Sequence, residues 1–539
     1  MKTPRPLISA VLALAAGGLA GQGAAPAPPT QAPEATAAAI LTPPSPPTPR
    51  INGPRIFGVR PGDPFLFSIP ASGSRPMRFS AADLPPGLAL DPATGRITGA
   101  LGSPGEFTVT LRAENALGAD ERPLRIVAGQ AIALTPPLGW NSWNCWGKEV
   151  SQEKVLRSAR AMVAAGLDQH GWSYINIDDG WQGLRTGAQG ALEPNGKFPD
   201  MAALADAIHA MGLKFGIYST PWTKSYAGFL GGSSENPDGR AGASFPVAAP
   251  RNGSMLPYAM GRYGFAARDA RQWAAWGVDY LKYDWGPVDV ADTAVMAAAL
   301  RATGRDIVLS LSNNGAGNIL GIVDGLAPLA QSWRTTNDIN DTWSRVVAIG
   351  FSQGPWAPHQ SPGHYNDADM LVVGHVGWGV PHPTRLTPDE QYTHISLWCL
   401  LGTPLLIGCD LEKLDPFTIG LLTNDEVLAV DQDALCRPAT RVSGDGDLQV
   451  YAKPLEDGSW AVGLFNLGPN EATVTARWQD LGAPGPKLVR DLWRQRDVGT
   501  FGGGYGARVA PHGVVLLRVS ASGNTPIGRE GAGAAAARD

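Results

Sequence analysis

The sequence has few of the features that identify several large classes of protein. Only four of its 539 residues are cysteine (Cys145, Cys399, Cys409 and Cys436), and no two of them form a CxxC pattern. A disulfide framework or a cysteine metal site is therefore not indicated, although the pairing of the four cysteines stays open. The eight histidines include no HExxH sequence. We therefore expect neither a bound metal nor another cofactor.

Charge and hydropathy exclude further classes. The formal net charge is −5, because 48 acidic residues outnumber 43 lysines and arginines. No basic surplus favours nucleic acid or an anionic membrane as partner. Beyond the N-terminus, no apolar run is long enough to span a membrane. The 44% hydrophobic and 17% charged residues are typical of a soluble globular protein, and the length predicts two or three domains.

The N-terminus has the pattern of a secretory signal peptide. Lys2 and Arg5 precede a short apolar run, residues 7–20, which small residues and then a proline-rich stretch follow. We expect a signal peptide over residues 1–24 and a secreted or periplasmic protein, with an uncleaved anchor as the alternative. Residues 25–50, rich in proline and alanine, cannot form a hydrophobic core and are predicted to be a linker.

Two segments are predicted to be all-β. Residues 51–129 contain short alternating runs such as Phe107–Leu111, separated by turns such as "LPPGLALDPATGRITG". This segment resembles the Ig-like modules of bacterial secreted proteins, which implies a spacer or docking role. Residues 438–520 alternate in the same way and predict an antiparallel β-sandwich. We expect residues 521–539 to form a disordered tail.

Between these segments, residues 135–437 alternate short apolar strands with amphipathic helices. Eight strands are expected, at 138–142, 173–178, 213–219, 279–284, 306–312, 330–334, 365–371 and 404–408. The helices between them include 153–166, 200–211 and 265–276. Eight such alternations over about 300 residues predict a (β/α)₈ barrel, whose functional site lies at the carboxyl ends of the strands. The long segment 223–263 is then a loop over that face.

The stretch "DYLKYDW" (279–285) carries an unusual pair of charges. In a strand, Tyr280, Lys282 and Asp284 point to one face, because side chains two apart share a face. A buried ammonium beside a carboxylate is costly unless the two are paired or used in function. The same pattern recurs at other predicted strand ends, with Asp178, Asp179, Tyr218, Arg334, Asp338, Asp367 and Asp369. Several acids from different strands indicate a polyol-binding pocket, and two carboxylates there suggest glycoside hydrolysis.

Six motifs make the resemblance to a known family specific. They follow the order and barrel positions of glycoside hydrolase family 27, the retaining α-galactosidases and α-N-acetylgalactosaminidases: "PPLGWNSWNCWG", "YINIDDGW", "GLKFGIYS", "DYLKYDW", "WRTTNDINDTW" and "YNDADMLVVG". The resemblance covers the whole predicted barrel and extends into the C-terminal β region. It implies a secreted exo-acting enzyme that removes terminal α-D-galactosyl residues from a carbohydrate substrate.

The resemblance also implies roles for individual residues. Asp284 matches the nucleophile and Asp338 the acid/base. Trp143 matches the aromatic wall of the sugar subsite, and Asp178 and Asp179 match the acids that hold the 4- and 6-hydroxyls. Further pocket positions are matched by Tyr218, Lys282, Arg334, Asp369 and Met370, while Ser312 and Asn313 occupy the loop on the 2-hydroxyl side.

Charge placement leads to an expectation for the two catalytic acids. Lys282, on the same face as Asp284 and with Arg334 nearby, is expected to keep Asp284 ionised. Asp338 is expected to lie further from compensating charge and to stay protonated, so that it can donate to the leaving oxygen.

Some positions depart from the family pattern and leave the sugar open. Where many members have Cys-Glu-Trp or Cys-Ser-Trp after the fifth strand, this chain has "LSLSNNGAG", and Gly180 replaces a cysteine of some relatives. Isomalto-dextranase, α-N-acetylgalactosaminidase and β-L-arabinopyranosidase activities are the alternatives within the family. A non-catalytic carbohydrate-binding protein is the alternative of another class. The oligomeric state is not indicated.

Overall fold

A computed structural model of the chain describes residues 39–186, 190–240, 258–312 and 319–521. The predicted signal peptide, the first part of the predicted linker, Asn313 and residues 522–539 lie outside the described residues.

The centre of the fold is a parallel sheet of eight strands. Its members, in spatial order, are β18 (Tyr365–Asp367), β17 (Ser332–Arg334), β16 (Val308–Ser312), β15 (Tyr280–Asp284), β12 (Lys214–Ser219), β11 (Tyr174–Asn176), β10 (Leu138–Asn141) and β21 (Leu405–Ile407). The sheet closes on itself through a parallel bridge between Leu371, just after β18, and Ile407. The predicted (β/α)₈ barrel is therefore confirmed, and each of its eight strands overlaps a predicted one.

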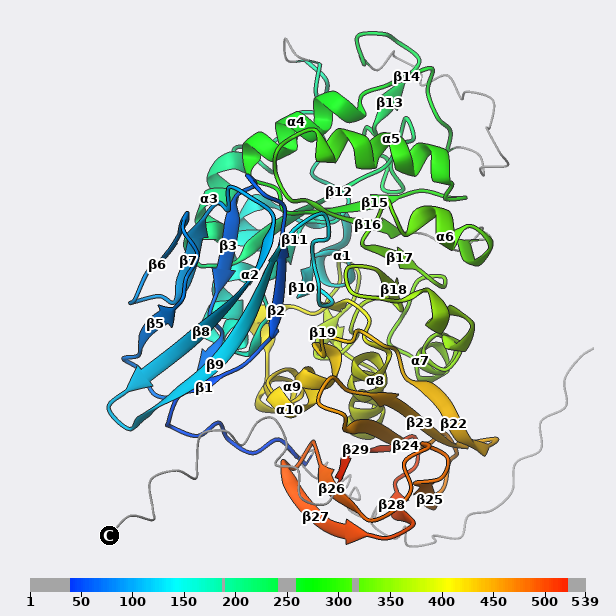
Figure 1. Cartoon of the computed structure of the whole chain (residues 1–539). Coiled ribbons are helices and arrows are strands. Elements are labelled where there is room, and N and C mark those ends of the chain that lie inside the picture. The colour runs from blue at the N-terminus through cyan, green and yellow to red at the C-terminus, as the bar shows by residue number, and fades with distance from the viewer. Residues whose placement is uncertain (1–38, 187–189, 241–257, 313–318, 522–539) are drawn as a thin grey trace, which may run out of the picture. The chain divides into compact units, whose positions relative to one another are not determined.

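Helices connect the strands and cover the outside of the barrel (Figure 1). They are α1 (Trp143–Trp146), α2 (Gln152–Ala164), α3 (Met201–Ala210), α4 (Ala266–Trp276), α5 (Val290–Arg301), α6 (Val323–Leu326), α7 (Trp343–Gly350), α8 (Pro388–Leu401), α9 (Pro416–Leu422) and α10 (Asp425–Asp431). Local sequence sets their ends. Ser151 caps α2 by accepting a hydrogen bond from Lys154 N, and Gly277 ends α4 in the left-handed conformation.

Side-chain alternation along β15 follows the predicted pattern. Leu281 and Tyr283 are buried in the main core between the sheet and its helices. Tyr280 instead points into the barrel, where it packs with Tyr174, Val308 and Leu406 in a small separate core. These side chains fill the barrel interior, so Lys282 and Asp284, further along the same face, lie above a closed floor.

The N-terminal region is a small β domain with its own core, which Phe67, Ile97, Leu111 and Ile126 help to form. Its strands are β1 (Arg50–Ile51), β2 (Ile56–Val59), β3 (Phe65–Ser68), β4 (Ala71–Ser72), β5 (Arg78–Ala82), β6 (Leu88–Leu90), β7 (Arg96–Gly99), β8 (Gly105–Asn115) and β9 (Gly118–Ala128). They form sheets of two, three and four strands.

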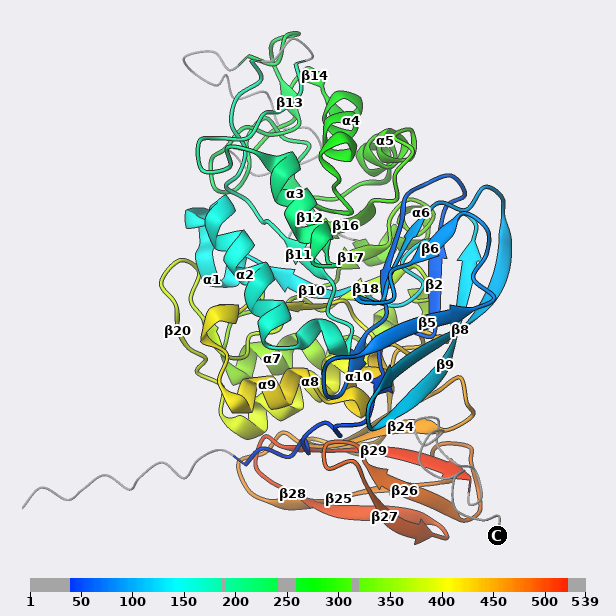
Figure 2. The ribbon, with the colours of Figure 1, turned by 90° about the vertical axis from the view of Figure 1, so that its left-hand side faces the viewer.

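The C-terminal region is an antiparallel sandwich, as expected. The strands are β22 (Thr440–Asp445), β23 (Leu448–Pro454), β24 (Trp460–Asn466), β25 (Ala472–Arg477), β26 (Lys487–Asp491), β27 (Arg496–Phe501), β28 (Gly504–Val509) and β29 (Val514–Ala521). Six of them form one sheet, and β25 pairs with β28 in a second (Figure 2). Val462, Trp478 and Leu517 belong to the core that the strands enclose.

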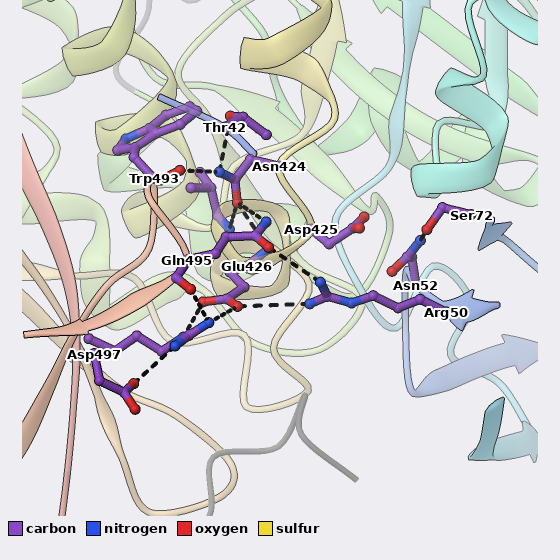
Figure 3. Close-up of polar contacts among 12 residues, drawn as sticks. Thr42, Arg50, Asn52, Ser72, Asn424, Asp425, Glu426, Trp493, Gln495 and Asp497 are labelled. Carbon is purple, nitrogen blue, oxygen red and sulfur yellow. Dashed lines mark hydrogen bonds and ion pairs between the residues drawn. The ribbon is translucent and has the colours of Figure 1, made fainter. Parts of the chain in front are cut away.

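A polar junction connects the chain before β1, the start of α10 and the β26–β27 hairpin (Figure 3). Arg490 donates two hydrogen bonds of 2.7 Å to the carboxylate of Glu426. Asn424 caps α10 and also donates to Thr42 Oγ1 at 3.1 Å and to the Trp493 carbonyl at 3.0 Å. We call this set of contacts the Glu426 junction. It holds together three segments that are far apart in sequence.

All four cysteines are buried and unpaired, so the described barrel contains no disulfide. Among the described residues, no helix combines the length and apolarity that crossing a membrane requires.

Candidate active site

The polar residues predicted at the strand ends meet at one end of the barrel. In a parallel barrel the carboxyl ends of all strands lie on the same side. Residues at these ends are therefore close together even when they are far apart in sequence. The described residues that contribute are Trp143 after β10, Asp178 and Asp179 after β11, Tyr218 on β12, Lys282 and Asp284 on β15, Ser312 on β16, Arg334 and Asp338 from β17 onward, and Asp369 and Met370 after β18.

Lys282 pairs with Asp178. Its Nζ lies 2.7 Å from Asp178 Oδ2, although the two residues are 104 positions apart. The other carboxylate oxygen of Asp178 accepts the Asp179 N–H at 2.8 Å. Burial opposes the charge on Lys282, but attraction to Asp178 and Asp284 outweighs it and raises the pKa of Lys282. The ammonium is therefore charged and held between two acids of the pocket.

Asp284 is buried and poorly satisfied. The residue is 7% exposed, and its Oδ1 has no hydrogen-bond partner among the described residues. Burial is the main cause that raises the pKa of Asp284 to about 7, reinforced by repulsion from Asp338, while Lys282 acts against it. We expected Lys282, with Arg334 nearby, to keep this carboxyl ionised. That expectation was wrong because burial outweighs a lysine whose hydrogen bond goes to Asp178.

Asp338 differs from Asp284 in its exposure, its hydrogen bonding and the direction of its pKa shift. Its side chain is 79% exposed, and Oδ1 accepts a hydrogen bond of 3.1 Å from Arg334 Nη2. The exposed carboxyl still loses part of its hydration to the neighbouring pocket walls, which opposes ionisation, but Arg334 and then Lys282 outweigh this effect and lower the pKa of Asp338. The expectation that Asp338 lies far from compensating charge was therefore wrong. The guanidinium comes from the end of β17, only four residues earlier.

Arg334 also binds Asp369, at 2.7 Å from Asp369 Oδ2. That same oxygen accepts the Ile339 N–H at 2.7 Å, and Oδ1 accepts the Met370 N–H at 2.8 Å. Asp369 has φ 76°, a left-handed conformation that is uncommon for a residue with a side chain. The hydrogen bonds of its carboxylate compensate for this strain. They place Met370 at the pocket, where it packs in the same small core as Trp143.

Asp179 lies beneath a loop that follows β12. Its Oδ1 accepts from Gln182 Nε2 at 3.0 Å, and its Oδ2 accepts the Ala227 N–H at 2.8 Å. Burial raises the pKa of Asp179 to about 6, despite these hydrogen bonds. Ser312 is buried at the end of β16. Asn313, the next residue and also a predicted site residue, lies outside the described residues.

Sequence reasoning assigned no role in the site to three residues, although it had already placed Asp367 among the polar strand ends. Asp367 is buried on β18, and burial raises its pKa to about 6. Asn176 is buried on β11, and neither its Oδ1 nor its Nδ2 has a partner among the described residues. The alternation that identified Asp178 could have found Asn176 as well, because the two residues share a face of the strand. Tyr226, in the loop after β12, has no comparable signal in the sequence.

The barrel matches a known family of enzymes. Residues 135–248 and 254–433, more than half of the chain, match the family model described as alpha galactosidase A. The chain belongs to this family, glycoside hydrolase family 27. Its C-terminal residues 445–519 match the alpha galactosidase C-terminal beta sandwich domain, and residues 48–127 match an Ig domain model.

Relatives of this α-galactosidase family member extend over most of its length. Alpha-galactosidase 2 of Arabidopsis thaliana is 36% identical over 414 residues, which is 75% of this chain and 94% of the relative. A solved Bacteroides fragilis structure, described as a candidate alpha-galactosidase/melibiase, has 33% identity and a TM-score of 0.78, with 88% of this chain and 98% of that chain covered. A solved β-L-arabinopyranosidase from Geobacillus stearothermophilus has 29% identity and a TM-score of 0.62, covering 73% and 98%.

Proposed function

We propose that this protein is a retaining exo-glycosidase that hydrolyses terminal α-D-galactosyl residues. The observation that carries the proposal is the contrast between two acids at one barrel end. Asp284 is buried with an oxygen that has no partner among the described residues, and Asp338 is exposed beside Arg334. Double displacement at a sugar carbon needs two carboxyl groups with different roles, one as nucleophile and one as acid/base, and this contrast gives the two acids different environments.

In the first step, Asp284 attacks the anomeric carbon and forms an ester bond to it. The bond from that carbon to the leaving oxygen breaks, and Asp338 gives its proton to this oxygen. The exposure of Asp338 supports proton donation at the solvent side, where the leaving group would depart. In the second step, Asp338 takes a proton from water while the water oxygen attacks the same carbon. Asp284 is released, and two inversions retain the configuration.

The sugar would lie between the nucleophile and the Asp178–Asp179 pair. The family resemblance assigns the 4- and 6-hydroxyls to these two acids. Lys282, bound to Asp178, links the hydroxyl-binding acids to the β15 end that carries Asp284. Below the site the barrel interior is filled by Tyr174 and Tyr280, which form the floor under the sugar. The half-buried ring of Trp143 would form a wall of this subsite.

The position of the proton in the free enzyme follows from the two pKa shifts. A raised pKa on Asp284 and a lowered pKa on Asp338 place a single shared proton mainly on Asp284. The reaction needs that proton on Asp338. The two acids titrate as a pair. The form with the proton on Asp338 and ionised Asp284 is therefore a constant fraction of all enzyme molecules that carry one proton on the pair. Activity should therefore persist until the pair loses its one proton.

We propose further that the protein is exported to the periplasm or the exterior. The support is the pattern of Lys2, Arg5 and the apolar residues 7–20, followed by a proline-rich stretch. Detection of the mature N-terminus near residue 24 in a periplasmic or culture fraction would test this proposal. Recovery of the full-length chain in the cytoplasm would contradict it.

A glycoside panel tests the proposed activity. We expect kcat/KM for p-nitrophenyl α-galactoside to exceed that for the α-glucoside by up to about 10⁴-fold, because a misplaced hydroxyl leaves buried carboxylates unpaired. Asp179→Ala should narrow this preference, mainly by slowing α-galactoside turnover. The panel should include the α-N-acetylgalactosaminide, the β-L-arabinopyranoside and dextran. Dominant cleavage of any of these three would overturn the galactoside assignment, and cleavage of none of the substrates would overturn the enzyme assignment.

A further inference from the structure

Three aromatic side chains form a compact group in the loop after β12. Trp222 and Tyr258 stack with ring centroids 4.7 Å apart and an interplanar angle of 16°. Tyr226 packs against both, at 5.1 Å from Trp222 and 4.7 Å from Tyr258. We call these residues the aromatic cluster. Trp222 is buried, whereas Tyr226 and Tyr258 are only half-buried, so the cluster has a base in the core and two rings that reach the surface.

Tyr226 is presented by a rigid turn. Ser225 N donates to the Phe229 carbonyl at 2.8 Å, and Phe229 N donates to Ser225 Oγ at 3.0 Å. Ser225 is fully buried. The Thr223 N–H donates to the Ala259 carbonyl at 2.9 Å, which connects the turn to the segment that carries Tyr258. A ring held in this way loses little conformational freedom when it binds a ligand.

The turn is attached to the catalytic pocket itself. Ala227, the residue after Tyr226, donates its N–H to Asp179 Oδ2 at 2.8 Å. Burial and then repulsion from Asp284, Tyr258 and Asp338 raise the pKa of the Tyr226 hydroxyl. Burial, Asp179 and Asp284 raise that of Tyr258. Tyr226 therefore lies in the field of both acids of the proposed reaction, and Tyr258 lies nearer the sugar-binding acid and the nucleophile.

A purely structural role explains only part of this arrangement. Packing of the loop would account for Trp222, which is 3% exposed, and for the stacking of Tyr258 on it. It does not require a hydroxyl at Tyr226, whose half-buried ring lies one residue before the N–H that binds Asp179. A phenylalanine would pack as well, without bringing a polar group into that field.

We propose that Tyr226 contacts the leaving group of the substrate, and that this leaving group is a sugar ring. This inference rests on the proposed function and extends it. The half-buried Tyr226 lies one residue before the N–H that binds Asp179, so its ring lies at the rim of the pocket. The exposed Asp338 must reach the leaving oxygen at that same open side. An aromatic face matches the apolar C–H face of a pyranose, and the phenol matches one of its hydroxyls. Trp222 and Tyr258 are positioning residues that hold Tyr226.

The experiment compares two substrates that differ only in the leaving group. Melibiose has a glucose leaving group, whereas α-galactosyl fluoride has only fluoride, which cannot contact Tyr226. For Tyr226→Ala, we expect kcat/KM on melibiose to fall about tenfold and kcat/KM on the fluoride to change less than about twofold. Tyr226→Phe keeps the ring and should lose no more than about threefold on melibiose. A loss of the same size on both substrates in a variant that stays folded, or no loss on melibiose, would overturn the proposal.

Two further variants keep the result interpretable. If Tyr226→Ala disturbs the turn and both activities collapse, Tyr226→Leu keeps the apolar bulk without an aromatic face, and its melibiose-to-fluoride ratio decides. Tyr505→Leu removes a tyrosine of an aromatic pair in the C-terminal sandwich and should leave the ratio unchanged. A wild-type enzyme that hydrolyses neither substrate would contradict the proposed function itself. Hydrolysis of both, with an unaltered ratio in the variants, would contradict only the role of Tyr226.

Discussion

The catalytic pocket and the Glu426 junction use the same kinds of residue in opposite ways. At the junction, the Glu426 carboxylate receives two hydrogen bonds from Arg490, and hydrogen bonding to Glu426 is the main cause that raises the pKa of Arg490. In the pocket, Asp284 Oδ1 and Arg334 Nε are buried without a hydrogen-bond partner within 3.5 Å among the described residues, and the nearby Tyr218 hydroxyl only partly lowers the raised pKa of Asp284.

This difference in hydrogen bonding has opposite effects on the stability of the fold and on the reactivity of the carboxylate. A buried carboxylate with a full set of partners stabilises the fold, because its desolvation is compensated by well-aligned hydrogen bonds. A buried carboxylate with an open lone pair destabilises the fold but is available to a substrate atom. We therefore expect substitutions in the pocket to affect activity and those in the junction to affect stability.

The largest effect is expected for Asp284→Asn. The amide cannot attack the anomeric carbon, so kcat should fall at least about 10⁴-fold. Stability should rise. Because the folded-state pKa of Asp284 is about 7, above its ordinary value of 3.8, ionisation costs the folded state stability as pH rises between these two values. The asparagine has no such cost. At pH 8, above both pKa values, its free energy of unfolding should exceed that of the wild type by about 4 kcal/mol, since each pKa unit corresponds to about 1.4 kcal/mol.

Thermal unfolding at pH 4 and pH 8 checks this stability difference, which should nearly vanish at pH 4. Azide should restore part of the activity in Asp284→Gly by attacking in place of the missing carboxylate. Near wild-type turnover in Asp284→Asn would refute its role as nucleophile.

Asp338→Ala should discriminate between leaving groups. A sugar leaving group needs a proton from Asp338, whereas an activated phenol leaves without one. We expect a loss of about 10²- to 10⁴-fold on melibiose and a much smaller loss of the first step with 2,4-dinitrophenyl α-galactoside. Pre-steady-state release of the phenol separates this step from the second one. Equal losses on the two substrates would mean that Asp338 acts in another way.

The fall of kcat/KM at high pH should require Asp338. In the wild type, kcat/KM should fall about tenfold per pH unit above about pH 7, where the pair of acids loses its shared proton. In Asp338→Ala, assayed with the activated aryl substrate, only ionised Asp284 is needed. Its kcat/KM should therefore rise with pH and then reach a plateau. A descending limb near pH 7 in both proteins would assign that limb to another group.

The smallest effect on activity is expected for Glu426→Ala. Loss of the Arg490 pair should lower the free energy of unfolding by about 1–3 kcal/mol, because a half-buried guanidinium loses its main partner. The kcat/KM per folded molecule should not change. Glu471→Ala is the matched control, since it breaks an exposed ion pair with Arg508 in the same β region and should change stability by less than about 0.5 kcal/mol. Urea titration with activity measured in parallel distinguishes the two variants.

Local pattern was sufficient to predict the barrel and most of its polar strand ends. The period of two along "DYLKYDW" placed Tyr280, Lys282 and Asp284 on one face, and β15 has that arrangement. The strand–helix alternation required the parallel strands to end at one side of the barrel, which brings Asp178 near Lys282. These features depend on neighbouring residues and on backbone geometry, and both can be inferred from the order of residues.

Tertiary structure alone decided how the charges are shared. Lys282 bonds to Asp178 rather than to Asp284, and Arg334 bonds to both Asp338 and Asp369. These contacts reverse the protonation that the sequence suggested for the two catalytic acids. The sequence likewise did not indicate that Tyr226 reaches their field. The physical reason is that desolvation and Coulomb interactions depend on depth and distance in the folded chain, whereas residue order specifies only local periodicity.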